Sequence, residues 1–210
     1  MRRARHGRLA LVSSSLADPP LRDDPTYRVA RRVLQKGTGW VLLNHGRESL
    51  VTALCQEFPR LPIALVAIDN VEFGRIQARQ LRGLLRPGAR ALCVRGNPFD
   101  SGCQERSAGL AEGLQGAHFS VEDVDGRWDP VLSETAVQRW ITSPLRVQAP
   151  LHAVVAQNDL MAMAAKRVLT RMSRELGRPE LQEVPVLGGD GLPGVGQAGW
   201  TRALWPPPCP

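Results

Sequence analysis

Several side chains along the sequence have types suited to holding a polyhydroxylated ligand. Arg106, Asn158 and Asp190 supply a guanidinium, an amide and a carboxylate. Each hydroxyl group of a polyol can both donate and accept a hydrogen bond, so these three groups together can satisfy several hydroxyls. An aromatic side chain such as Trp128 or Phe99 can cover the apolar face of a sugar ring. These residues are candidates for a ligand-binding site.

The same residues also have purely structural interpretations. Asn158 and its neighbour Asp159 have the side chains preferred at the start of a helix. Asp190 lies between two glycines and is suited to a turn. Trp128 can be an aromatic residue packed at the surface. Residue chemistry by itself leaves the functional and the structural interpretation open.

Motifs of catalytic and metal centres are absent from the sequence. It has no H-E-x-x-H, G-x-S-x-G or Walker loop, and none of its four cysteines (Cys55, Cys93, Cys103 and Cys209) has C-x-x-C spacing. Residues 189–194 match G-x-G-x-x-G, but the chain ends without the second strand and the acidic residue that a dinucleotide site needs. We therefore expect no enzymatic activity, no cofactor and no metal.

The positive charge is concentrated near the N-terminus. The formal net charge is +7, and residues 1–47 alone hold ten basic and three acidic side chains, which is +7. The remaining residues hold 17 of each sign, so nucleic-acid binding by the folded part is not expected. The sequence has no run of about 18 apolar residues, so membrane insertion is not expected either.

The elements that must position these residues alternate between strands and helices from residue 39 onward. Short β-rich runs are followed by amphipathic stretches, which predicts an α/β fold with a doubly wound parallel sheet. The predicted strands are 40–43, 63–68, 89–94, 118–124, 152–156 and 185–188, and the predicted helices are 71–86, 104–115, 131–142 and 159–176. Ligands of such sheets bind at the carboxyl ends of the strands, where Asn158 and Asp190 lie.

Four motifs resemble those of type I periplasmic sugar-binding proteins, the ribose-binding group, and of the sensor domains of lac-repressor-type regulators. Residues 156–165 (AQNDLMAMAA) resemble the Q-N-D-x-M-A segment of this family, and residues 188–193 (GGDGLP) resemble its G-x-D-G-x-P turn. Residues 68–74 (IDNVEFG) resemble the crossing between its two lobes, and residues 104–110 (QERSAGL) resemble a helix start. The resemblance implies two doubly wound lobes that close on a ligand.

The resemblance also implies roles for individual residues. Arg106, Asn158 and Asp190 match motif positions that hydrogen-bond ligand hydroxyls, and Trp128, within residues 125–129, matches the stacking aromatic. Asn44 and His45 stand where the family often has Asp-Arg, so a permanently charged donor is replaced by a titratable one.

The resemblance divides the chain into four segments. We expect an irregular basic leader at 1–38, a partial first lobe with the crossing strand at 39–69, a nearly complete second lobe at 70–197 and an aberrant Pro-rich tail at 198–210. The segment 1–38 is too short for the βα units with which the family's first lobe begins. We therefore expect a chain that is incomplete at both ends and that binds ligand weakly by itself, because one wall of the site is missing.

The expected function is binding of a small sugar as the substrate-binding component of a bacterial ABC uptake system. A small-molecule sugar is the expected ligand, an ABC permease is the candidate partner, and the periplasm or cell envelope is the expected location. One alternative is the effector-sensing domain of a cytoplasmic regulator, and another is a truncated, non-functional remnant. Residues before 39 show neither a convincing signal peptide nor a helix-turn-helix pattern.

Overall fold

The structure is a computed structural model of the chain, and it describes residues 21, 23–43, 48–146 and 149–191. The chain divides into two compact units. The first runs to Asp69 and includes Phe99–Gly102, and the second holds Asn70–Pro98 and the chain from Cys103 onward. The predicted Pro-rich tail at 198–210 lies outside the described residues.

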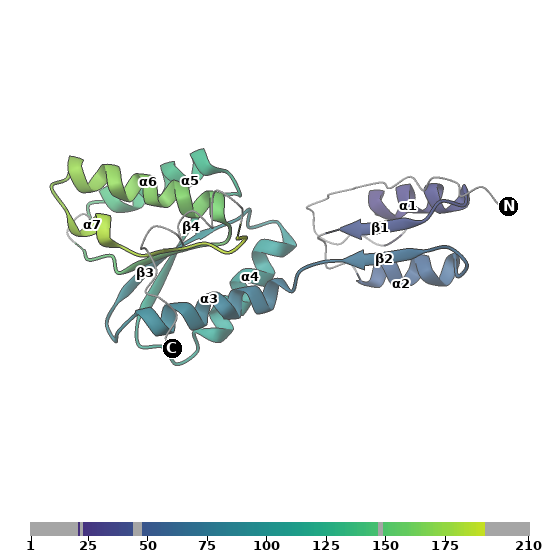
Figure 1. Ribbon diagram of the computed structural model, residues 1–210, viewed down its shortest axis with the longest axis horizontal. Helices are drawn as coiled ribbons and strands as arrows, with labels where there is room; N and C mark the ends of the chain where they lie inside the picture. The colour runs from purple at the N-terminus through teal and green to yellow at the C-terminus, as the bar shows by residue number, and fades with distance from the viewer. Residues whose placement is uncertain (1–20, 22, 44–47, 147–148, 192–210) are drawn as a thin grey trace. The chain divides into compact units, whose positions relative to one another are not determined.

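The first unit contains two parallel strands and two helices (Figure 1). In chain order these are α1 (Pro25–Gln35), β1 (Trp40–Leu43), α2 (Glu48–Glu57) and β2 (Ile63–Val66). Trp40 lies opposite Ile63 in the parallel pair. Its core consists of the buried residues Ala30, Leu34, Trp40, Leu42, Leu50 and Leu54.

Helix α1 shows that the prediction of an irregular leader over residues 1–38 is wrong for residues 25–35. Asp24 is the N-cap, with its side chain accepting a hydrogen bond from the backbone N–H of Thr26 at 2.7 Å, and Pro25 opens the helix. Ala30 and Leu34, four residues apart, are buried against the strands. Asp24 and Pro25 thus mark a helix start within the segment predicted to be irregular.

The second unit is built on a four-stranded parallel sheet in the order β4-β3-β5-β6. The strands are β3 (Arg90–Arg95), β4 (Ser120–Asp125), β5 (Ala153–Ala156) and β6 (Val186–Leu187). The helices are α3 (Asn70–Leu84), α4 (Ser101–Gly113), α5 (Pro130–Thr142), α6 (Asp159–Glu175) and α7 (Glu180–Glu183). The predicted fold class is confirmed, and α1, α2 and α7 are additional to the predicted helices.

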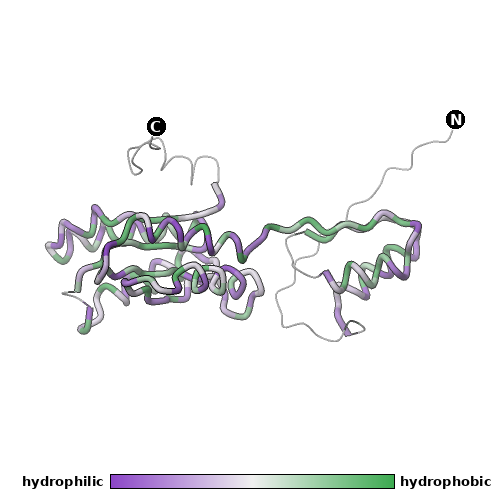
Figure 2. The backbone as a smooth tube through the Cα atoms, turned by 90° about the horizontal axis from the view of Figure 1, so that it is seen from below, coloured by the Kyte–Doolittle hydropathy of each residue, from purple (hydrophilic) through white to green (hydrophobic). Residues whose placement is uncertain are grey.

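Helices cover both faces of this sheet, with α3 and α4 on one face and α5 and α6 on the other (Figure 1). Alternate residues of β3 enter the two cores: Leu92 and Val94 pack with α5 and α6, whereas Ala91 and Cys93 pack with α3 and α4. Both faces of the strand are therefore apolar, as parallel sheets require. The helices alternate between hydrophobic and hydrophilic residues, as expected for elements that bury one side (Figure 2).

Glu122 of the edge strand β4 links this strand to Trp140 of α5 and to Arg146. Glu122 accepts hydrogen bonds from Nε1 of Trp140 at 3.2 Å and from Nε of Arg146 at 2.8 Å. The hydrogen bond from Arg146 is the main cause that lowers the pKa of Glu122 below its ordinary value of 4.5. A lowered carboxyl pKa contributes stability above the ordinary value, and this contribution is lost as the pH falls through the folded-state pKa.

The Glu122→Gln variant is therefore expected to unfold more easily than the parent by about 1 kcal/mol at pH 7. Urea unfolding followed by circular dichroism should show this difference shrinking as the pH falls below 4.5, the ordinary carboxyl value. Glu180, whose side chain is 57% exposed beside Arg178, provides the control, because Glu180→Gln should leave the urea midpoint unchanged. A difference for Glu122→Gln that persists undiminished at low pH would contradict the electrostatic origin.

None of the helices in the described part of the chain is long and apolar enough to cross a membrane.

Candidate functional site

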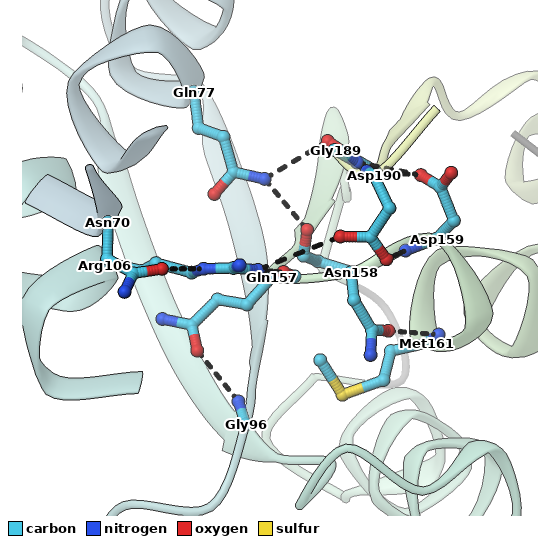
Figure 3. Close-up of polar contacts among 12 residues, drawn as sticks. Asn70, Gln77, Gly96, Arg106, Gln157, Asn158, Asp159, Met161, Gly189 and Asp190 are labelled. Atoms are coloured by element: carbon cyan, nitrogen blue, oxygen red, sulfur yellow. Dashed lines mark hydrogen bonds and ion pairs between the residues drawn. The ribbon is translucent and has the colours of Figure 1, made fainter. Parts of the chain in front are cut away.

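The carboxyl ends of β3, β5 and β6 lie side by side in the sheet, and the candidate residues gather there (Figure 3). Asn158 follows β5 and Asp190 follows β6, while Arg106 reaches the same place from α4. Nη1 of Arg106 lies 4.0 Å from Oδ1 of Asp190. The structure thus brings together the three polar residues that the sequence singled out in the second unit.

Arg106 is held in one orientation although it carries a full charge and is only 8% exposed. Its Nε donates to Oδ1 of Asn70 at 2.9 Å, and its Nη1 donates to the backbone oxygen of Gln157. Its guanidinium carbon lies 4.1 Å from the ring centroid of Phe73 and 5.4 Å from that of Trp128. Hydrogen bonds together with aromatic faces offset the cost of burying the guanidinium.

Asn158 is the N-cap of α6, so its predicted structural role is confirmed. Its Oδ1 accepts a hydrogen bond from the backbone N–H of Met161 at 2.8 Å. Its amide nitrogen makes no hydrogen bond within the residues that the structure describes (Figure 3). A single side chain therefore caps the helix with its oxygen and leaves two N–H donors. Its chain neighbours Gln157 and Asp159 hydrogen-bond Arg106 and Asp190, so Asn158 belongs to the same strand end.

Asp190 is anchored by its neighbour across the strand ends, Asp159. Oδ1 of Asp159 accepts from the backbone N–H of Gly189 at 2.8 Å and from that of Asp190 at 3.2 Å. In return, the backbone N–H of Asp159 donates to Oδ2 of Asp190 at 3.2 Å. Asp159 is buried, whereas the side chain of Asp190 is 30% exposed. Asp159 thus positions Asp190, which reaches solvent.

Gln77 of α3 is a positioning residue that the sequence did not reveal. The pairing of β5 with β6 extends over two residues and ends at Leu187. Beyond this point, Nε2 of Gln77 donates to the backbone oxygens of Ala156 at 2.8 Å and of Gly188 at 3.2 Å (Figure 3). The amide of Gln77 therefore bridges the two segments that carry Asn158 and Asp190, where direct backbone hydrogen bonds between β5 and β6 have ended.

Gln157 likewise had no assigned role, although it lies within the Q-N-D segment. Its side chain is buried, and Oε1 accepts from the backbone N–H of Gly96 at 2.8 Å. Its Nε2 donates to the backbone oxygen of Cys103 at 3.2 Å and to the hydroxyl of Ser107 at 2.9 Å. Gln157 ties the ends of β3 and β5 to α4, and so it positions the helix that carries Arg106.

Comparison with known proteins agrees with this arrangement. The profile of the periplasmic binding protein domain matches residues 58–198, which is more than half of the chain. The chain belongs to the periplasmic binding protein family. The predicted resemblance is confirmed. A search of curated protein sequences finds no significant match.

Several solved structures of sugar-binding and solute-binding proteins share the fold at low sequence identity. An ABC transporter solute-binding protein from Burkholderia multivorans is 20% identical, with a TM-score of 0.63 over 84% of this chain and 58% of the other. A Caulobacter myo-inositol binding protein is 21% identical, with a TM-score of 0.57 over 82% and 52%. The binding protein of the arabinose ABC transporter from Shewanella sp. ANA-3 is 14% identical, with a TM-score of 0.56 over 70% and 55%. The chain spans somewhat more than half the length of these proteins.

Trp128, the aromatic residue predicted to stack on a ligand, has an unusual backbone. Arg127 and Trp128 have φ angles of 54° and 62°, in the left-handed region that side chains larger than glycine rarely adopt. A Cβ atom at Gly96 would overlap the indole of Trp128, so the ring lies directly on the backbone after β3. One neighbour of the ring is the guanidinium of Arg106, 5.4 Å from the centroid. Strain of this kind is typical of functional sites.

The structure does not bring the remaining predicted residues to this site. Asn44 and His45 lie outside the described residues. Phe99, the alternative aromatic residue, is 73% exposed and is grouped with the first unit. Within the described ranges, no three His, Cys, Asp or Glu side chains gather in a way that could hold a metal ion.

Proposed function

We propose that the chain binds a small sugar or a similar polyol, without catalysis, as the substrate-binding component of a bacterial ABC uptake system. The observation that carries this proposal is the amide nitrogen of Asn158, which makes no hydrogen bond in the described chain. Its neighbours in the chain, Gln157 and Asp159, hydrogen-bond Arg106 and Asp190, which lie 4.0 Å apart. Donors and acceptors of fixed orientation at one site suit vicinal hydroxyl groups, which need both.

The relatives support the uptake role. The Burkholderia and Shewanella proteins belong to ABC transport systems, and the Caulobacter and Shewanella proteins bind myo-inositol and arabinofuranose. An ABC permease is then the partner of this chain, and the periplasm or cell envelope is its location. Fractionation of the native cells tests the location, and recovery of the chain from the cytoplasm would favour the effector-sensing alternative.

Binding by the chain alone is expected to be weak, with a dissociation constant of about 1 mM, because the residues described here provide only one side of a site. Titration of the ¹⁵N-labelled chain with D-ribose, L-arabinose, D-galactose and myo-inositol should show saturable shifts for at least one of them. The shifts should centre on Arg106, Asn158 and Asp190. Absence of any shift would overturn the proposed function and favour the non-functional remnant.

The Asn158→Asp variant tests the role of the free amide. Aspartate retains the cap of α6, because its carboxylate can still accept from Met161, but it removes the two N–H donors. The affinity for the bound sugar should therefore fall about tenfold or more with little change in unfolding.

Gln138→Glu provides the matched control. It makes the same amide-to-carboxylate change on the exposed face of α5, where Gln138 accepts a hydrogen bond from Arg171. This variant should bind sugar as the parent does. Equal losses of affinity in Asn158→Asp and Gln138→Glu would show that added negative charge, rather than the lost donors, causes the effect.

A further inference from the structure

Asn70 of α3 lies between two residues of α4, Glu105 and Arg106, and hydrogen-bonds both. Nδ2 of Asn70 donates to Oε2 of Glu105 at 2.9 Å, and Oδ1 of Asn70 accepts from Nε of Arg106 at 2.9 Å. Asn70 is the first residue of α3 and only 8% exposed. Both polar ends of one buried amide are thus engaged, each by a different residue of α4.

Helices α3 and α4 lie close enough together for the short side chain of Asn70 to hydrogen-bond both Glu105 and Arg106. A Cβ atom at Gly74 would overlap the backbone oxygen of Arg106, and one at Gly109 would overlap that of Val71. The backbones of α3 and α4 are therefore in direct contact, and Asn70 spans the remaining distance.

The carboxylate of Glu105 decides which way the amide of Asn70 faces. An ionised carboxylate only accepts hydrogen bonds, so it selects the orientation in which Nδ2 faces Glu105. Oδ1 then necessarily faces Arg106, whose Nε–H only donates. In the reversed orientation the amide oxygen would face the carboxylate, and the amide N–H₂ would face the guanidinium N–H, so both contacts would be repulsive.

We propose that Glu105 and Asn70 are positioning residues that set the orientation of Arg106 for ligand binding. This inference rests on the proposed function, because Arg106 is the group that would hydrogen-bond the ligand. Nε is held by Asn70 and Nη1 by the backbone oxygen of Gln157, and these two hydrogen bonds together restrict rotation of the guanidinium. A rigid donor loses less entropy on binding than a mobile one, so this support raises ligand affinity.

The orientation of Arg106 can be measured without any ligand. In ¹⁵N spectra of arginine side chains, the Nε–H of Arg106 should exchange slowly with water, because it is buried and hydrogen-bonded. Glu105→Ala should accelerate this exchange about tenfold, and Asn70→Leu should accelerate it at least as much. Glu105→Gln should retain most of the protection, since its amide oxygen can still accept from Asn70. The affinity for the sugar that the parent binds should also fall about tenfold in Glu105→Ala and in Asn70→Leu.

Glu112→Ala is the matched control. Glu112 lies two turns after Glu105 on α4 and also reaches α3, where it accepts from Nη2 of Arg75 at 2.9 Å. Its removal loses a contact between the same helices without touching Asn70. Equal acceleration of the Arg106 exchange in Glu112→Ala and Glu105→Ala would overturn the inference, because general loosening of the helices would then explain both.

The two readouts separate the inference from the proposed function. If exchange accelerates in Glu105→Ala and Asn70→Leu while the parent binds none of the four sugars, the positioning of Arg106 is supported and the sugar-binding proposal fails. If the parent binds a sugar and neither variant changes the exchange or the affinity, the positioning role is overturned and sugar binding stands.

Discussion

The Gly109→Val variant is expected to lose about 3 kcal/mol or more of unfolding free energy, one of the two largest effects that the structure predicts. The reason is steric. Gly109 of α4 faces the backbone oxygen of Val71, and any Cβ atom there would overlap it. Because the obstacle is main chain, no side-chain rotation can relieve the clash, and α3 must move away from α4. Urea unfolding of the parent and the variant measures the loss.

Gly83→Ala is the control for this experiment. Gly83 lies near the end of α3, and a Cβ atom there would meet nothing within 4 Å. Alanine favours helix over glycine, so this variant should be unchanged or more stable by up to about 1 kcal/mol. Similar urea midpoints for Gly109→Val and Gly83→Ala would show that α3 and α4 are not in backbone contact.

The second large effect is expected for Asp159→Ala, which should lose about 3 kcal/mol of unfolding free energy. The variant leaves the N–H groups of Gly189 and Asp190 without the carboxylate that accepts from both, in a place where Asp159 is only 4% exposed. Sugar affinity should fall as well, because Asp190 loses its anchor. Thermal or urea unfolding, together with the sugar titration described above, measures both consequences.

Asp129→Ala makes the equivalent change at a more exposed position. Asp129 also accepts from two backbone N–H groups, those of Val131 and Leu132, both at 2.8 Å, at the start of α5. Water can replace the lost acceptor there, so a loss of only about 1 kcal/mol is expected. If Asp159→Ala lowers the free energy of unfolding no more than Asp129→Ala does, burial does not strengthen the contribution of the Asp159 hydrogen bonds to stability.

Much of the second unit could be predicted because its signals are local. Runs such as Ala91–Val94 are apolar at every position, as a strand buried on both faces must be, and the structure places Ala91 and Cys93 on one face and Leu92 and Val94 on the other. Asn158 before an amphipathic run correctly predicted the start of α6. Ligands of such sheets bind at the carboxyl ends of the strands, so Asn158 and Asp190, which directly follow strands, were expected at that end of the sheet.

Local signals were misleading where one residue type serves two kinds of structure. Asp24 and Pro25 are common in loops, but Asp is also a good N-cap and Pro fits the first helical turn. Only the burial of Ala30 and Leu34 against β1 and α2 distinguishes the two, and that burial depends on residues distant in the sequence.

The sequence by itself determined the parallel α/β fold, the family and the presence of Asn158 and Asp190 directly after strands, because periodicity, caps and motif spacing are properties of neighbouring residues. That Arg106 reaches the same strand ends from α4 depends on the tertiary structure. Tertiary structure alone decided how these groups are held. Asn70 meets Arg106 across 36 positions of sequence, and Gln77 meets Gly188 across 111. No local pattern specifies such pairs, because a hydrogen bond requires its two groups within about 3 Å, and only the packing of α3 and α4 on the sheet brings them that close.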